Sequence, residues 1–533
     1  MTGREEEREE LRRTWRALGI YPQVTAGEAL TQGAADHPDD AIVFAAVDGA
    51  NEHATLASLH AGGRRIAAAL HELGVRPGDV VAVQGPADRA STELLEGLWL
   101  LGTVVVPLVA AYGAAEIAHV VRESGATTYV SPPAWRGVEL SAQAVEHAAG
   151  WGLDRVVALG GDAPLRAVPL SALAADGDPP LVTPSPAEVC CIIYTSGSTA
   201  APKGVQHSHE TLLAGVTAVP ADRSTRTLAT FPAGHIASLL GLLRPLAVGG
   251  TTVVMDRWSA RRAAELIEEH RLSFSAGTPF FLSTLLDEAE RSGRDISSLR
   301  TFLCGAASVP PALVARATDA GIISWRTYGA TEHPAISTGV ADDPVDKRMR
   351  TDGRVSPGNE VRLVDEHGND VAPGEEGEII ARGPKQFLGY RDASLDDAAF
   401  LGSWFRTGDL GRFDDDGFLI ITDRVKDIII RGGENISARE VEDVLAGHPD
   451  VDEVAVCAAP DEVWGERVCA FVRAAPGSKP TLEALAAHVI GTGLAAHKAP
   501  AELVVVDDFP RTSAGKIRKQ DLRASLREPL AKR

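Results

Sequence analysis

The stretch of residues 192–205, IIYTSGSTAAPKGV, constrains this chain more than any other. The apolar residues 190–193 lead into it and predict a buried strand. Small and hydroxyl-bearing residues follow, and such a loop turns backbone N–H groups toward the oxygens of a polyphosphate. Lys203 adds a positive charge, and Pro202 stiffens the exit. A Ser/Thr/Gly turn alone is more often a hydrophilic turn between strands, but the closing Pro-Lys-Gly makes this string more specific. The Walker spacing is absent.

Length and charge limit the class of protein. A chain of 533 residues is too long for one core and predicts at least two domains. A formal charge of −21 argues against a nucleic-acid partner, because phosphate backbones need basic patches. The five cysteines show no metal-ligand spacing and are interpreted as reduced core residues. With no signal segment and no run that spans a bilayer, a cytoplasmic location without a membrane span is expected.

The order of predicted elements indicates the fold class. The pattern 25–28 (Thr-Ala-Gly-Glu) is a capping box that opens a helix. Helical stretches then alternate with short apolar strands up to about residue 304, which predicts α/β sheets, doubly wound with helices on both faces. After about residue 350, segments 360–364 and 377–382 predict an antiparallel, β-barrel-like element. We expect a large N-terminal domain over residues 1–425 and a small α+β C-terminal domain over residues 426–533.

Three further motifs carry chemistry. Glu332 in the segment 328–333, YGATEH, is able to hold Mg²⁺, which prefers carboxylate and phosphate oxygens. Thr331 beside it is able to donate to an α-phosphate. The segments 404–409, WFRTGD, and 510–518, PRTSAGKIR, contain Asp409 and Lys516. Each motif alone is more often a solvated loop, a common turn or a basic tail.

Together and in this order, from about residue 190 to 522, these motifs resemble the adenylate-forming superfamily, which includes acyl-CoA synthetases, firefly luciferase and peptide-synthetase adenylation domains. The usual phosphate loop there is Tyr-Thr-Ser-Gly-Ser-Thr-Gly-x-Pro-Lys-Gly. This chain departs from it at Ala200, which stands where the family has its second loop glycine.

The resemblance implies roles for individual residues. Asp409 would accept both ribose hydroxyls, Thr199 and Glu332 would hold Mg²⁺, and Lys516 would contact the carboxylate and the bridging α-phosphate oxygen. The catalytic residues would be Lys516, Thr331, Glu332 and His235. The residues implied to bind ATP or AMP are Thr195, Ser196, Gly197, Ser198, Thr199, Lys203, Gly305, Ala306, Ala307, Tyr328, Gly329, Ala330, Thr331, Asp409 and Arg424.

The resemblance also implies a mobile C-terminal domain with its hinge at Lys426, and a CoA site formed by His235, Gly432 and Gly433. For His235, a core histidine is the commoner fate, but the family often has a histidine or an aromatic residue between the acyl pocket and the thiol entrance. Residues 231–241 contain no Asp, which argues against an α-amino acid, and His-Ile replaces the His-Asn of hydroxybenzoate enzymes.

The predicted acyl pocket is small-walled and apolar, which indicates a bulky apolar acid such as an alicyclic, polycyclic or medium-to-long aliphatic one. The alternative is that these small residues merely pack against neighbouring helices. The pocket residues are Ala233, Gly234, Gly277, Ala307 and Ile336.

The resulting hypothesis is an acyl-CoA synthetase that uses ATP, Mg²⁺ and CoA and forms an acyl-adenylate before the thioester. One alternative is an enzyme that mainly performs the second half-reaction on an adenylate supplied by a partner synthetase, since Ala200 would weaken the first. A second alternative is a ligase that loads a carrier protein. A non-enzymatic nucleotide sensor is disfavoured, because it would be expected to have lost some of Lys516, Glu332, Asp409 and Arg424. A homodimer fits the family resemblance.

Overall fold

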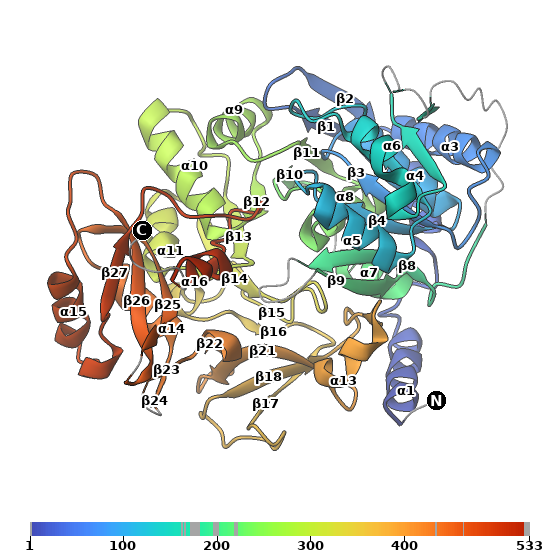
Figure 1. The fold of residues 1–533 in the computed structure, drawn as a ribbon. Coiled ribbons are helices and arrows are strands. Elements are labelled where there is room, and N and C mark those ends of the chain that lie inside the picture. The colour runs from blue at the N-terminus through green and yellow to red at the C-terminus, as the bar shows by residue number, and fades with distance from the viewer. Residues whose placement is uncertain are drawn as a thin grey trace.

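The computed structural model describes residues 3–160, 164, 167–170, 182–195, 202–217, 222–431, 434–461 and 463–526. Two large sheets form most of the molecule, a third lies at the bottom of the view and a fourth at its left (Figure 1). The fold is mixed α/β, with a large N-terminal and a smaller C-terminal domain, as predicted. Among the described residues, no helix is long and apolar enough to cross a membrane.

The eight-stranded sheet contains the strand that leads into the predicted phosphate loop. Its order is β19-β9-β8-β4-β3-β5-β6-β7. The strands from β8 to β7 are parallel, whereas β9 and β19 are antiparallel to their neighbours. The strands are β3 (Val80–Gln84), β4 (Val104–Leu108), β5 (Thr128–Ser131), β6 (Arg155–Ala158), β7 (Val168–Pro169), β8 (Val189–Thr195), β9 (Lys203–Ser208) and β19 (Gly389–Tyr390).

The nine-stranded sheet supplies the two other N-terminal motifs. Its order is β16-β15-β14-β13-β12-β10-β11-β1-β2, parallel from β14 to β1 and antiparallel at both edges. The strands are β1 (Ala41–Ala45), β2 (Asn51–Thr55), β10 (Arg226–Ala229), β11 (Thr251–Met255), β12 (Phe274–Gly277), β13 (Thr301–Gly305), β14 (Ile323–Tyr328), β15 (Ser337–Thr338) and β16 (Arg354–Val355).

Helices cover both faces of the two sheets, as the alternating pattern predicts. The main core lies between the sheets and includes α2, α3, α4, α7 and α8. A second core places α9, α10 and α11 on the outer face of one sheet, and a third places α5 and α6 on the other. The helices are α2 (Ala26–Asp36), α3 (Leu56–Glu72), α4 (Arg89–Leu100), α5 (Ala114–Ser124), α6 (Leu140–Trp151), α7 (His209–Thr217), α8 (Ile236–Val248), α9 (Ala260–His270), α10 (Pro279–Ser292), α11 (Pro311–Asp319) and α12 (Val345–Arg350).

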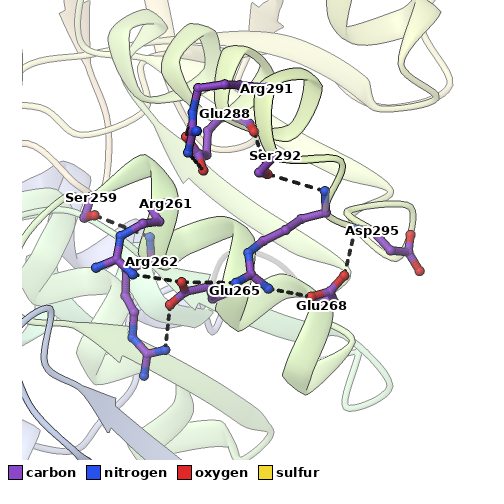
Figure 2. Close-up of polar contacts among 10 residues, drawn as sticks. Ser259, Arg261, Arg262, Glu265, Glu268, Glu288, Arg291, Ser292 and Asp295 are labelled. Atoms are coloured by element: carbon purple, nitrogen blue, oxygen red, sulfur yellow. Dashed lines mark hydrogen bonds and ion pairs between the residues drawn. The ribbon is translucent and has the colours of Figure 1, made fainter.

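Ion pairs link α9 to the segment that follows α10 (Figure 2). Arg294 follows α10 and contacts two acidic residues of α9, Glu268 at 2.7 Å and Glu265 at 3.3 Å. The backbone N–H of Asp295 donates to Glu268 at 2.9 Å. Exposed pairs each contribute little to stability, so these contacts add modestly to the apolar packing of α9 and α10 on the sheet.

The third sheet is antiparallel and confirms the strands predicted at 360–364 and 377–382. Its strands are β17 (Glu360–Val364), β18 (Gly377–Arg382), β20 (Phe400–Leu401), β21 (Trp404–Phe413) and β22 (Leu419–Arg424). The short helices η2 (Ala393–Leu395) and α13 (Asp396–Ala399) lie at its edge. The N-terminal helix α1 (Gly3–Ala17) lies beside α13 and contains no fully buried residue.

The fourth sheet contains only residues after Lys426, and two cores of its own lie against it. The short helix η3 (Val425–Asp427) leads into it, so the predicted hinge residue lies between the third and fourth sheets. The domain boundary at Lys426 stays a prediction. The strands are β23 (Ile429–Arg431), β24 (Glu434–Ile436), β25 (Val451–Asp461), β26 (Gly465–Ala474) and β27 (Glu502–Val505), and the helices are α14 (Ala438–Leu445), α15 (Leu482–Gly491), η4 (Ala496–Lys498) and α16 (Lys519–Leu526).

The cysteines lie inside the domains. All five are buried and form no disulfide bond, and they lie two in β8 and one each in β13, β25 and β26. Burial raises the pKa of Cys304 to about 12 and that of Cys457 to about 11, so both thiols stay protonated at neutral pH.

Candidate active site

The antiparallel hairpin β8–β9 presents the predicted phosphate loop. Thr195 and Lys203 pair at its mouth, so both loop ends are placed by the ladder. Five predicted loop residues, Ser196, Gly197, Ser198, Thr199 and Ala200, lie outside the described residues.

Tyr390 connects this hairpin to the Thr331–Glu332 motif. Its strand β19 pairs with β9, opposite Val205, and the ammonium of Lys203 lies 5.1 Å from the centre of the Tyr390 ring. The Tyr390 hydroxyl donates to the carboxylate of Glu332 at 2.7 Å. Burial and the charge of Glu332 raise the pKa of Tyr390, so its hydroxyl keeps its proton. Sequence reasoning did not identify Tyr390, because only the pairing of two segments far apart in the chain brings it here.

Two buried basic residues, which sequence reasoning also missed, hold the loop that carries Thr331 and Glu332. Nε2 of His207 lies 2.8 Å from the carbonyl oxygen of Thr331, and the Lys385 ammonium donates to the carbonyl of Ala335 at 2.9 Å. Burial lowers the pKa of His207 to about 4 and that of Lys385 to about 8. His207 is therefore neutral at physiological pH, whereas Lys385 is largely charged.

The same loop is closely packed at Gly329. A Cβ atom there would lie 2.5 Å from the backbone nitrogen of Ala335, so no larger residue fits without movement of the backbone. Ala330 closes the turn, exchanging backbone hydrogen bonds with His333 at 3.1 and 3.2 Å. The loop is thus held in one conformation from both sides.

Asp409 lies between Tyr328 and Arg424 at the junction of the second and third sheets. The Tyr328 hydroxyl donates to Oδ2 of Asp409 at 2.8 Å, and Nε of Arg424 lies 2.9 Å from Oδ1. Asp409 and Arg424 are direct partners in the β21–β22 ladder. Asp409 therefore contacts both of the other predicted nucleotide-binding side chains, and its ribose role stays a prediction.

Lys516, a residue of the C-terminal domain, lies near Asp409 and Arg424. Burial and Arg424 lower its pKa to about 8, while the charges of Asp409 and Glu332 oppose that shift. Its ammonium therefore shares the electrostatic field of the motif residues of the large domain. The described structure brings together Lys516, Glu332, Asp409 and Arg424.

The loop that carries Lys516 docks on the starts of α8 and α10. Nε2 of His235 lies 3.0 Å from the hydroxyl oxygen of Ser513. The Arg511 guanidinium lies 4.8 Å from the centre of the Phe280 ring. A Cβ atom at Gly515 would approach Phe280 to 2.7 Å, so a glycine permits this close contact. Burial, followed by the charge of Lys516, lowers the pKa of His235 to about 4, which leaves its imidazole neutral.

The segment predicted to face adenine follows β13. Gly305 is buried, and a Cβ atom there would lie 2.6 Å from Cγ2 of Thr327. Ala306 and Ala307 are exposed. Ala306 has φ +66°, a left-handed conformation that alanine seldom adopts. The turn therefore leaves an open shelf of small residues beside Tyr328.

The predicted acyl-pocket residues do not all line one cavity. Ala233 and Gly234 line an apolar cavity of about 40 Å³ between α8 and the ends of β3 and β4. Gly234 has φ +95°, and a Cβ atom there would lie 2.6 Å from the backbone nitrogen of Val109. Gly277 is packed between Phe281 and Phe302, and Ile336 is fully buried. Neither of those two residues lines this cavity, and Ala307 does not line it either.

The thiol side of the predicted site is described in part. Gly432 and Gly433 lie outside the described residues, between Arg431 and Glu434, which pair in the β23–β24 hairpin. Next to this hairpin, Gly465 pairs with Arg431, and Trp464 beside it is 53% exposed. This places an exposed aromatic ring beside the Arg431–Glu434 pair of the hairpin.

The residues of this site suit an Mg²⁺ ion that is bound by one carboxylate together with the phosphate oxygens of a nucleotide. Glu332 is 9% exposed, and its Oε1 is occupied by Tyr390. Among the described residues, no group of three or more His, Cys, Asp or Glu side chains forms a metal cage. Mg²⁺ commonly binds one or two carboxylates together with substrate phosphates, so a single carboxylate is the donor set expected for a nucleotide-bound ion.

Comparisons with known proteins agree with this geometry. A family model described as AMP-binding enzyme matches residues 30–391, and one described as AMP-binding enzyme C-terminal domain matches residues 440–516. A medium-chain fatty-acid–CoA ligase of Escherichia coli (strain K12) is 32% identical over 532 residues, 97% of this chain and 93% of that protein. A feruloyl-CoA synthase of Amycolatopsis sp is 35% identical over 466 residues, 86% of this chain and 91% of that protein.

A solved structure extends the likeness to three dimensions. The o-succinylbenzoate coenzyme A synthetase of Bacillus subtilis, in complex with ATP and magnesium ion, superposes with a TM-score of 0.80 at 26% identity, covering 94% of this chain and 99% of that one. The match covers 94% of this chain, so it spans both domains.

Proposed function

Because this chain belongs to the AMP-binding enzyme family of adenylate-forming ligases, we propose that it is an acyl-CoA synthetase acting on a bulky apolar carboxylic acid. It joins the acid to the AMP portion of ATP and then transfers the acyl group to the thiol of CoA. The relatives act on fatty and feruloyl acids, which supports an acid with a large apolar body.

The observation that carries this proposal is the meeting of Lys516 with Glu332, Asp409 and Arg424 in one electrostatic field. In the first half-reaction, an oxygen of the carboxylate forms a bond to the α-phosphorus of ATP. The bond from that phosphorus to the bridging oxygen breaks, and pyrophosphate leaves. Lys516 supplies a fixed positive charge where negative charge develops, and a preorganised charge there acts mainly on the transition state. Glu332 would hold Mg²⁺, which would supply positive charge to neutralise the phosphates.

The second half-reaction needs another face of the C-terminal domain. The thiol sulfur attacks the acyl carbon, its proton passes to solvent, and the bond to the AMP oxygen breaks. Lys516 and the Arg431–Glu434 hairpin lie on separate parts of this domain, and the Lys516 loop occupies the site in the present structure. We place the predicted hinge at Lys426 and infer a rotation that exchanges the two faces, which is a conformational step of the lid type.

The experiment separates the two half-reactions. Lys516→Ala should lower pyrophosphate release by several orders of magnitude, because one preorganised charge at the reacting phosphate is worth roughly 3–4 kcal/mol. Thioester formation from a supplied acyl-adenylate and CoA should change much less. Arg518→Ala is the matched control, since Arg518 is 54% exposed on the same loop. Lys426→Pro should show the reverse pattern by restricting the hinge. An equal loss of both half-reactions in Lys516→Ala would contradict the rotation.

Ala200 favours a second candidate function. An alanine in place of the loop glycine acts against ATP and pyrophosphate, which use this loop, more than against acyl-AMP, which lacks the β- and γ-phosphates. The protein would then mainly convert a supplied acyl-adenylate into its thioester. Mass spectrometry of products from a panel of acids, each offered with ATP or as its adenylate, distinguishes the two candidates. The same assay with a pantetheinylated carrier protein in place of CoA identifies the acceptor.

A further inference from the structure

We propose that the N-terminal helix α1 positions the magnesium and phosphate side of the active site, with Arg8 and Arg16 as the positioning residues. The inference rests on the proposed function, because it concerns how the Mg·ATP site is held. The family model begins at residue 30, so α1 lies outside it. No residue of α1 is fully buried, so the polar contacts of its arginine side chains contribute much of its attachment to the protein.

Arg8 holds the backbone of the segment that precedes Tyr390. Its Nη1 donates to the carbonyl of Leu388 at 2.9 Å, and its Nη2 donates to the carbonyl of Phe387. The guanidinium also lies 4.7 Å from the centre of the Phe400 ring, which stacks on Phe387 at 5.1 Å. The planar fork of arginine suits this arrangement, because it binds two carbonyls and a ring face at once.

The side of residues 387–390 that faces away from Arg8 contacts Glu332, the predicted Mg²⁺ ligand. The backbone N–H of Phe387 donates to the carbonyl of Glu332 at 2.7 Å, and the Tyr390 hydroxyl donates to the Glu332 carboxylate at 2.7 Å. The Tyr390 ring also faces the Lys203 ammonium. Residues 387–390 therefore contact Glu332 twice and Lys203 once, and Arg8 holds the same residues from behind.

Arg16 attaches the other end of α1 beyond the phosphate-loop strand. Its Nε lies 2.6 Å and its Nη2 2.9 Å from the two carboxylate oxygens of Glu210. The Glu210 side chain is only 3% exposed and belongs to the first turn of α7, which directly follows β9. A bidentate pair of this kind fixes orientation as well as distance. Helix α1 thus reaches from residues 387–390 to the start of α7. The first segment includes β19, which pairs with β9, and α7 directly follows β9 in the sequence.

Loss of these contacts should affect the binding of Mg·triphosphate and not the binding of AMP. A shift of residues 387–390 moves the Tyr390 hydroxyl away from Glu332 and its ring away from Lys203. Both changes act on Mg²⁺ and on the β- and γ-phosphates. AMP has neither of these phosphates, and its predicted ribose contacts to Asp409 lie on β21. Loss of Arg8 should therefore weaken binding of Mg·triphosphate and leave binding of AMP almost unchanged.

The test is isothermal titration calorimetry of the full chain with Mg²⁺ and the non-hydrolysable analogue α,β-methylene-ATP, and separately with AMP. Arg8→Ala should raise the dissociation constant of the Mg·analogue at least fivefold, with AMP binding changed by less than twofold. Arg8→Lys should recover part of the loss. Arg13→Ala is the matched control, because Arg13 is an exposed arginine of the same helix. Arg16→Ala should shift the Mg·analogue in the same direction.

A second measurement tests whether Arg8 and Tyr390 act on the same site through each other. Tyr390→Phe should weaken the Mg·analogue as Arg8→Ala does, and the double variant should lose less than the product of the two single losses, because both act through one contact chain. Equal weakening of AMP and Mg·analogue in Arg8→Ala, or no weakening of either while the wild-type protein binds both, would overturn this inference alone. A wild-type protein that binds neither nucleotide would overturn the proposed function together with it.

Discussion

Nε2 of His235 lies 3.0 Å from the hydroxyl oxygen of Ser513, and this contact joins the large domain to the loop that carries Lys516. The pKa of His235 is lowered to about 4, chiefly by burial and then by Lys516, so the imidazole does not titrate near neutral pH. His235 therefore does not account for a change in activity between pH 7 and 9, and within this contact Lys516 is the candidate.

The first prediction concerns pH. The pKa of Lys516 is lowered to about 8, so its ammonium is charged below that pH and is lost above it. Since the first half-reaction needs the charge, kcat/KM for ATP should fall as pH rises and be about tenfold below its plateau one unit above the pKa. Pyrophosphate release measured from pH 6.5 to 9.5 tests this.

The Lys516→Arg variant is the control for this profile. A guanidinium keeps its charge throughout the range, so the variant should be slower and should lose the part of the fall that comes from Lys516. A fall of the same shape in Lys516→Arg, or a flat profile in the wild-type protein, would assign the pH dependence elsewhere.

The second prediction concerns the size of the acid. Ala233 lines the apolar cavity beside α8, and Ala307 is exposed on the shelf after β13. Ala233→Leu and Ala307→Leu should each lower kcat/KM for large apolar acids more than for small ones, because the added side chain occupies volume that only a large acid needs. Thioester yields from an acid series of increasing length check this. A wild-type preference for acetate, or for a charged acid, would be incompatible with an apolar pocket.

The third prediction concerns Ala200. If the loop needs the left-handed conformation that glycine reaches freely, an alanine there would cost roughly 1–2 kcal/mol, and its methyl group would take space beside the phosphates. Ala200→Gly should therefore raise ATP–pyrophosphate exchange at least tenfold, about 1.4 kcal/mol, without accelerating thioester formation from a supplied adenylate. If the unmodified protein already adenylates its best acid as fast as it transfers it to CoA, Ala200 has no such role and the ordinary ligase function stands.

The fourth prediction concerns stability. Lys385 is 5% exposed, and burial lowers its pKa to about 8 from a model-peptide value of 10.5. The unfolded state thus binds more protons than the folded state between these two values, so wild-type stability rises with pH across that window. Relative to Lys385→Met, the wild-type protein should gain about 2 kcal/mol of unfolding free energy between pH 7.5 and 9.5.

Urea unfolding at the two pH values measures this difference. Lys347→Met provides a comparison at the surface, because ion pairs with Asp414 and Asp416 raise the pKa of Lys347. Lys347 stays charged across the window, so its variant should differ from the wild-type protein by the same amount at both pH values. If the difference in unfolding free energy between the wild-type protein and Lys385→Met is the same at both pH values, the Lys385 ammonium is not desolvated in the folded protein.

The local patterns predict the architecture well and the support of the site poorly. The capping box at Thr25 and the strands at 360–364 and 377–382 form as expected, because each depends on residues close together in the chain. Asp409 and Arg424 come together by the β21–β22 register. Tyr390, His207 and Lys385 reach the site only through tertiary packing, and no periodicity distinguishes them from other polar residues. The charged segment before residue 18 shows no apolar stripe, so its contacts depend on partners far along the chain.

The burial of all five cysteines has a practical consequence for following the reaction. Disulfide reagents that count thiols attack thiolates that they can reach, and a protonated thiol inside a core reacts slowly. In samples withdrawn from a reaction of the native protein, such a reagent should register the free thiol of CoA alone, so consumption of CoA is measured as less colour in later samples. After denaturation, five further equivalents should appear per chain, one for each cysteine. The same thiol titration therefore measures CoA consumption in native samples, and the difference between native and denatured samples reports whether the fold is intact.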